Sequence, residues 1–126
     1  MDATEVARAV DAARAAVGAP ADCEYSWRPV TRLDPGRPPY LLVGLGGGGS
    51  GWVVALSPDG VVQGRAADPD GARAWWSGVD GELVWAPGSW SRSPLYPLRR
   101  VARGDEMVLL DHEGRLVPDA PDGPGG

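Results

Sequence analysis

The stretch YLLVGLGGGGSGWVVAL, residues 40–56, decides the fold of this 126-residue chain. Its two apolar runs, 40–45 and 52–56, have the length and composition that are typical of β-strands. The glycine-rich segment that joins them predicts a flexible connection. We therefore expect two paired strands on either side of this segment.

The same stretch contains Gly44-x-Gly46-x-x-Gly49, which has the spacing of a dinucleotide-binding loop. Such a loop binds pyrophosphate because it opens a helix whose amino end attracts the anion. Here a β-branched segment, residues 52–54, follows in place of a helix. The sequence therefore predicts no nucleotide site and no cofactor.

The elements around this stretch follow from capping, turn and alternation patterns. Residues 2–17 predict a helix that Asp2 caps and Gly18 ends. Residues 24–33 predict a strand that Pro29 places at an edge of the sheet, and Asp68-Pro69 predicts a short helix over 69–77. Further strands are expected over 61–65, 82–86, 98–102, 107–111 and 115–117.

Together these elements predict an α+β fold. The N-terminal helix is expected to pack on a twisted, mostly antiparallel sheet of about five to seven strands. A single domain is expected over residues 1–117. The tail, residues 118–126 (PDAPDGPGG), is expected to be disordered because it lacks large apolar side chains.

Composition excludes several kinds of chemistry. The chain has no Lys, Ile, Phe or Asn, and its 12 basic residues are all Arg, which is typical of a GC-rich bacterial genome of the actinobacterial kind. Without lysine there is no Schiff-base or phosphate-binding lysine. The net charge of −5 argues against nucleic acid as a partner, and no apolar run reaches the roughly 20 residues of a membrane span. Because the N-terminus shows no export signal, we expect a cytoplasmic protein.

The single histidine and the single cysteine are the candidates for catalytic groups. His112 lies between Asp111 and Glu113, which could orient it as a general base, but it falls at the tip of a predicted hairpin, where polar residues collect. Cys23 would need His112 as its base, and a lone cysteine is more often part of the packing. One His and one Cys do not make a zinc site without several carboxylates. We expect no catalytic residue and no metal site.

Tryptophan and arginine single out a candidate binding surface between residues 75 and 103. The chain has six tryptophans, and residues 89–103 carry four arginines and no acidic residue. Trp75 and Trp76 are adjacent, so on a helix they cannot both face the same neighbour. Because Trp and Arg are enriched in interface hot spots, the predicted partner-binding residues are Trp75, Trp76, Trp90, Arg92, Arg99, Arg100 and Arg103. The arginines predict a partner protein with an acidic surface.

Residues 40–44, 47–49, 52–56 and 59–62 have the order strand, glycine-rich turn, strand, Gly and Val. This order resembles the central strands of the SUKH superfamily. Many members of that superfamily are cytoplasmic immunity proteins that bind and block a partner toxin. The resemblance implies a protein-binding function.

Three functions fit the sequence. We expect a non-enzymatic protein-binding domain, of an immunity or other accessory type. One alternative is a small enzyme or ligand-binding protein with a pocket formed by Trp and Arg. The other is a structural subunit that buries its tryptophans in a homodimer.

Overall fold

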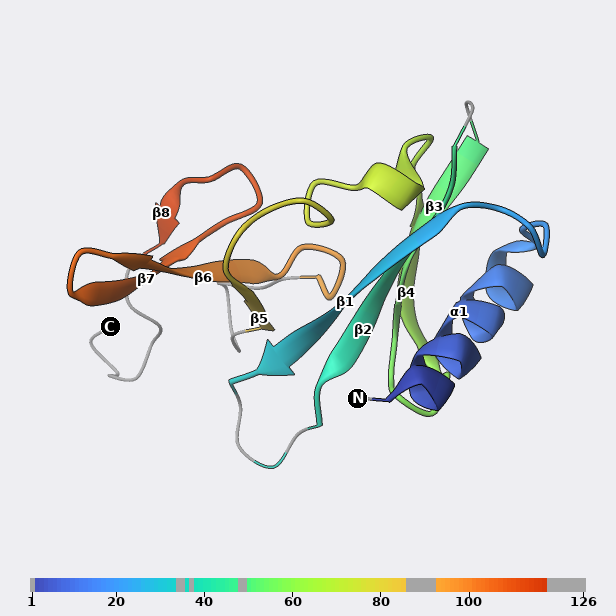
Figure 1. The fold of residues 1–126 in the computed structure, drawn as a ribbon, viewed down its shortest axis with the longest axis horizontal. Coiled ribbons are helices and arrows are strands. Elements are labelled where there is room, and N and C mark those ends of the chain that lie inside the picture. Colours follow the sequence, from blue (N-terminus) through green and yellow to red (C-terminus); the bar gives the residue numbers. More distant parts are fainter. Residues whose placement is uncertain (1, 34–35, 37, 48–49, 86–92, 118–126) are drawn as a thin grey trace.

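The computed structural model describes residues 2–33, 36, 38–47, 50–85 and 93–117. This part of the chain contains helix α1 (Ala3–Val17), one turn of 3-10 helix, η1 (Gly71–Arg73), and an eight-stranded sheet (Figure 1). The strands are β1 (Tyr25–Arg32), β2 (Tyr40–Gly47), β3 (Ser50–Leu56), β4 (Val62–Ala67), β5 (Glu82–Trp85), β6 (Leu98–Arg103), β7 (Glu106–Leu110) and β8 (Leu116–Val117). Their order is β4-β3-β2-β1-β5-β6-β7-β8, and all neighbours are antiparallel except β1 and β5. The predicted α+β fold is confirmed.

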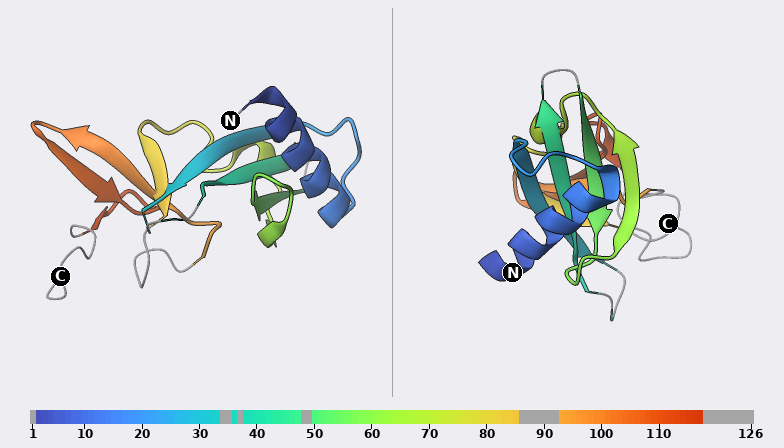
Figure 2. Two further views of the ribbon diagram at one scale, coloured as in Figure 1. Left: turned by 90° about the horizontal axis from the view of Figure 1, so that it is seen from below. Right: turned by 90° about the vertical axis from the view of Figure 1, so that its right-hand side faces the viewer.

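Helix α1 begins and ends where the sequence predicts. The Asp2 carboxylate accepts a 2.8 Å hydrogen bond from the backbone N–H of Glu5, and Gly18 ends the helix with a φ of 69°. The buried residues of α1 are Ala9, Val10 and Ala13. Because two of these three are alanines, the helix can lie close against β2 and β3, across one face of the sheet (Figure 2).

Strand β2 is central because both of its faces are covered. On one face Val43 and Leu45 pack beneath α1, and on the other Tyr40 and Leu42 pack in a cluster with Trp76. Alternate side chains of a strand point to opposite faces. A strand buried on both faces therefore needs the continuous apolar run that this stretch provides.

Two glycines allow η1 to rest directly on the sheet. A Cβ atom on Gly44 would lie 1.8 Å from the carbonyl oxygen of Gly71, and one on Gly71 would lie 2.4 Å from the carbonyl oxygens of Leu45 and Trp52. Pairing of β2 with β3 continues to Gly47, so a strand and not a helix follows the glycine motif. Gly44 is therefore required for backbone packing, a role that the nucleotide-loop spacing does not reveal.

The prediction that β1 is an edge strand is wrong. Residues 25–30 pair with β2, and residues 31 and 32 also pair with β5. Along a strand, the backbone N–H groups of every second residue point to the same side. The N–H of Leu33 donates to the Trp85 carbonyl, on the β5 side. The nitrogen of Pro29, four residues earlier, therefore also faces away from β2. The β5 pairing begins only at residue 31, and the missing N–H of Pro29 therefore breaks no ladder bond.

The short helix expected over 69–77 is reduced to the single turn η1. The Asp68 carboxylate accepts a 2.9 Å hydrogen bond from the backbone N–H of Asp70, two residues on. This local bond belongs to a turn and competes with helical pairing. The sheet has eight strands, one more than the predicted upper bound of seven, because every segment predicted as a strand, 115–117 included, joins the same sheet.

Strands β6 to β8 lie at the opposite end of the molecule from α1 (Figures 1 and 2). They have their own small core, which consists of Val84, Leu98 and Leu109 with Leu33 and Val117 packed against it. The predicted tail, residues 118–126, lies outside the described residues. None of the helices described has the length and apolar character needed to cross a membrane.

Candidate functional site

The adjacent tryptophans that follow η1 point to different environments. Trp76 is 0% exposed and lies in the main core with Tyr40, Leu42 and Leu83, so the structure does not place it on a binding surface. Trp75 is partly exposed and packs against the margin of the same core. Burial therefore removes Trp76 from the predicted partner-binding residues, because its side chain fills the space above β2, and partner binding by Trp75 stays a prediction.

Arg28, on β1, holds the loop that carries these tryptophans. Its guanidinium donates hydrogen bonds to the carbonyl oxygens of Trp76 (2.7 Å), Val79 (2.9 Å) and Gly81 (2.6 Å). Burial lowers the pKa of Arg28, and the neighbouring positive charge of Arg99 lowers it further. A planar fork with several donors can bind three carbonyls together, which an ammonium group cannot do in the same geometry.

Trp75, Tyr96 and His112 form an aromatic cluster from three separate segments. The His112 ring centroid lies 4.9 Å from that of Tyr96 and 6.1 Å from that of Trp75, and the rings are tilted by 50° and 56°. These distances are within the range of favourable aromatic pairs. Tyr96 is 46% exposed, so the cluster forms part of the surface of the molecule.

The turn between β7 and β8 fixes the backbone on either side of His112. The Asp111 carboxylate accepts 2.9 Å hydrogen bonds from the backbone N–H groups of Glu113 and Arg115. Burial alone would raise the pKa of Asp111, but these hydrogen bonds lower it below its ordinary value. The side chains of Glu113 and Arg115 form an ion pair. His112 Nε2 lies 3.6 Å from a carboxylate oxygen of Glu113, which is too long for a hydrogen bond.

The structure divides the predicted arginine cluster between the two faces of β6. Arg99 and Arg103 lie on the face that Leu83 shares, because Leu83 is directly opposite Arg99. Arg100 lies on the other face, where it forms an ion pair with Glu82. Trp90 and Arg92 lie outside the described residues.

Arg99 joins the aromatic cluster at a surface cavity of about 250 Å³. The cavity is lined by Trp75, Val79, Arg99, Asp111, His112, Glu113 and Gly114. Within the described part of the chain no carboxylate lies within ion-pair distance of Arg99: Asp111 is occupied by backbone N–H groups and Glu113 by Arg115. We call Trp75, Tyr96, Arg99 and His112 the aromatic–arginine face.

This arrangement does not supply an acid–base pair. His112 has no hydrogen-bonding carboxylate among the described residues, and Cys23 packs against the cluster that α1 covers. Helix α1 lies at the opposite end of the molecule from the turn between β7 and β8 (Figure 1). No group of three or more His, Cys, Asp and Glu side chains suited to a metal ion occurs in the described ranges. The geometry is suited to contact with another molecule.

Two residues of the site could not be assigned from the sequence. Tyr96 belongs to a Pro-rich segment whose only signal was its aromatic side chain, and Arg28 lies more than 40 positions from the loop it holds. The position of Arg28 between Trp27 and Pro29, within a predicted strand, gives no indication of its hydrogen-bond partners. The pairing of Arg28 with a distant loop requires the tertiary fold.

Comparisons of this chain with protein-family models, with curated proteins and with solved structures found no match. The resemblance of residues 40–62 to the SUKH superfamily therefore stays a prediction.

Proposed function

We propose that this protein is a non-enzymatic protein-binding domain, and that its aromatic–arginine face binds an acidic surface of a partner protein. The observation that carries the proposal is the exposed Tyr96 ring in tilted contact with His112, which lines one cavity together with Trp75 and Arg99. Aromatic residues and arginine supply most of the binding energy in protein interfaces. An immunity protein, as the SUKH resemblance implies, is one kind of protein with this function.

The face is held in place before any partner arrives. The Trp75 side is fixed because the next residue, Trp76, is buried, and the Trp76 carbonyl accepts a hydrogen bond from Arg28. The His112 side is fixed by the two backbone hydrogen bonds to Asp111. A face that is already ordered loses little conformational entropy on binding, which favours affinity.

The positive charge of Arg99 favours a partner with acidic side chains. Arg99 lies near the Arg28 guanidinium, which already donates three hydrogen bonds to backbone carbonyls. A carboxylate from a partner would relieve the repulsion between these two cations and could form a bidentate pair with Arg99. The affinity of such a contact should fall as the salt concentration rises.

Site-specific photocrosslinking in cells of the native host tests the proposal. A photoreactive amino acid replaces Tyr96, which is 46% exposed, and in a matched control it replaces Tyr25, which is 49% exposed and lies on β1. We expect a crosslinked protein at position 96 that is absent at position 25.

Binding of the purified partner then supplies the quantitative test. Tyr96→Ala and Arg99→Glu should each weaken the partner's affinity by about tenfold or more, whereas Tyr25→Ala should change it by less than about twofold. Equal crosslinks at both positions, or an unchanged affinity for Arg99→Glu, would contradict the proposed face. Thermal unfolding of each variant separates a loss of contact from a loss of fold.

A further inference from the structure

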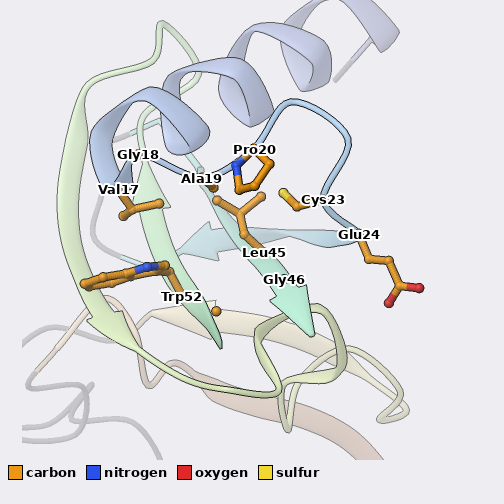
Figure 3. Close-up of a pocket in the computed structure, with 10 residues that line it drawn as sticks. Val17, Gly18, Ala19, Pro20, Cys23, Glu24, Leu45, Gly46 and Trp52 are labelled. Atoms are coloured by element: carbon orange, nitrogen blue, oxygen red, sulfur yellow. The ribbon is translucent and has the colours of Figure 1, made fainter. Parts of the chain in front are cut away.

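A second concave site lies at the other end of the molecule, beside the end of α1. This cavity has a volume of about 500 Å³, which is within the range of small-molecule sites. Its apolar wall is formed by Val17, Ala19, Pro20, Leu45 and Trp52. Figure 3 shows the Trp52 ring and Val17 on one side, with Pro20 and Cys23 on the other and Leu45 between them.

The position of the cavity follows from the chain path. Gly18 ends α1 in the left-handed conformation, and Ala19, Pro20 and Cys23 then line the cavity before β1 begins. Below it, Leu45 and Trp52 are directly opposite each other in β2 and β3, on the face that α1 covers.

The charges around the cavity favour a positively charged group. Among the ten lining residues Glu24 is the only ionisable one besides the thiol of Cys23, and no arginine is included. Arg14 is close, but its guanidinium contacts Asp11 (3.6 Å), the Cys23 carbonyl and the Tyr25 ring. In Figure 3 Glu24 extends away from the other labelled side chains, so its carboxylate lies at the rim.

We propose that this cavity binds a small organic cation with an apolar body. The apolar or aromatic part would occupy the space between Trp52 and Pro20, and the ammonium or similar group would remain at the rim near Glu24. Burial of apolar surface supplies the affinity, and the rim charge supplies the preference for a cation over an anion. This site does not depend on the aromatic–arginine face.

The test uses three probes that share a naphthalene ring and differ in the charge of their substituent: 1-naphthylmethylammonium, 1-naphthalenemethanol and 1-naphthoate. Calorimetry gives the affinity of each probe. Cys23 is the single cysteine of the chain and lines the cavity, so its alkylation by iodoacetamide gives an independent readout. We expect the ammonium to bind most tightly, the carboxylate most weakly, and the ammonium to slow the alkylation of Cys23.

Two variants separate the apolar and the charged contributions. Glu24→Gln should lower the affinity for the ammonium probe by about two- to fivefold, which is the range of an exposed charge pair, and leave the affinity for the alcohol unchanged. Ala19→Leu should fill the cavity and abolish binding, whereas Ala15→Leu adds the same side chain at an exposed position of α1 and should have no effect. If Ala19→Leu does not fold, Glu24→Gln still decides the charge preference.

Three outcomes would overturn the proposal. In the first, no probe binds or slows the alkylation of Cys23. In the second, the carboxylate binds as tightly as the ammonium, which would assign the cavity to ligands of another charge. In the third, the alcohol and the ammonium bind equally and Glu24→Gln changes neither, which would leave an apolar site with no preference for a cation.

Discussion

Replacement of Arg28 by methionine is the most direct test of how the loop between η1 and β5 is held. Methionine has a similar length and no hydrogen-bond donor, so Arg28→Met removes the bonds to the carbonyls of Trp76, Val79 and Gly81 together. Two of these three bonds are partly buried, and the one to Gly81 is exposed.

The magnitude follows from the environment of each bond. A hydrogen bond with a charged donor contributes about 1.5–3 kcal/mol when it is buried, and less when water can replace it. Removal of the nearby Arg99 repulsion offsets part of the loss. We therefore expect Arg28→Met to lower the free energy of unfolding by about 2–4 kcal/mol, which is a fall in Tm of about 8–16 °C for a domain of this size.

Guanidinium denaturation followed by tryptophan fluorescence measures this change. Arg28→Lys keeps the charge but cannot span three carbonyls, so its loss should be intermediate. Arg103→Met is the matched control, because Arg103 is exposed and has no ion pair within the described residues; it should change stability by less than about 0.5 kcal/mol. If Arg28→Met is as stable as Arg103→Met, the guanidinium does not hold the loop.

Three other changes follow from particular contacts. Gly44→Ala should cost more than about 3 kcal/mol, because the new Cβ would meet the Gly71 carbonyl at 1.8 Å, whereas Gly78→Ala has open space and should be nearly neutral; thermal unfolding compares the two. Tyr40→Phe should cost about 1–2 kcal/mol in urea denaturation, because the buried Tyr40 hydroxyl donates a 2.7 Å hydrogen bond to the Pro94 carbonyl, and an unchanged midpoint would mean that this bond contributes nothing. The hydrogen bond from Arg100 lowers the pKa of Glu82 below its ordinary value of 4.5, so Glu82 stabilises the fold above that pH and this contribution is lost as the pH falls through the lower, folded value. Glu82→Gln should therefore make stability less dependent on pH below about pH 4.5, and a pH profile identical to that of the wild type would refute the role of this pair.

Much of the fold could be predicted because local patterns and tertiary packing agree. The cap at Asp2, the stop at Gly18 and the apolar runs of β2 and β3 each favour the structure that forms. The prediction went wrong where a residue's role depends on a distant neighbour. Pro29 indicated an edge, but its strand has a neighbour on each side, because β5 begins pairing just beyond it.

The candidate site could be predicted only in part, for the same reason. The Trp75 to Arg103 segment was identified from composition, yet composition cannot tell which of two adjacent tryptophans is buried. Alternation along the predicted strand places Arg99 and Arg100 on opposite faces, but only the tertiary structure decides which of them lies beside His112. His112 and Tyr96 meet through the turn between β7 and β8, which no local pattern connects to residue 96.

The sequence by itself determined the helix and most of the strands, because caps, glycines and apolar runs act locally. The lack of lysine also excluded Schiff-base and phosphate-binding lysine chemistry, since that depends on composition alone. The tertiary structure alone decided that Gly44 is needed beneath Gly71, that Arg28 binds a loop far along the chain, and that a cavity lies beside Trp52. Contacts of this kind join segments that are distant in sequence, and their energies depend on distances of a few ångströms that only the packed chain defines.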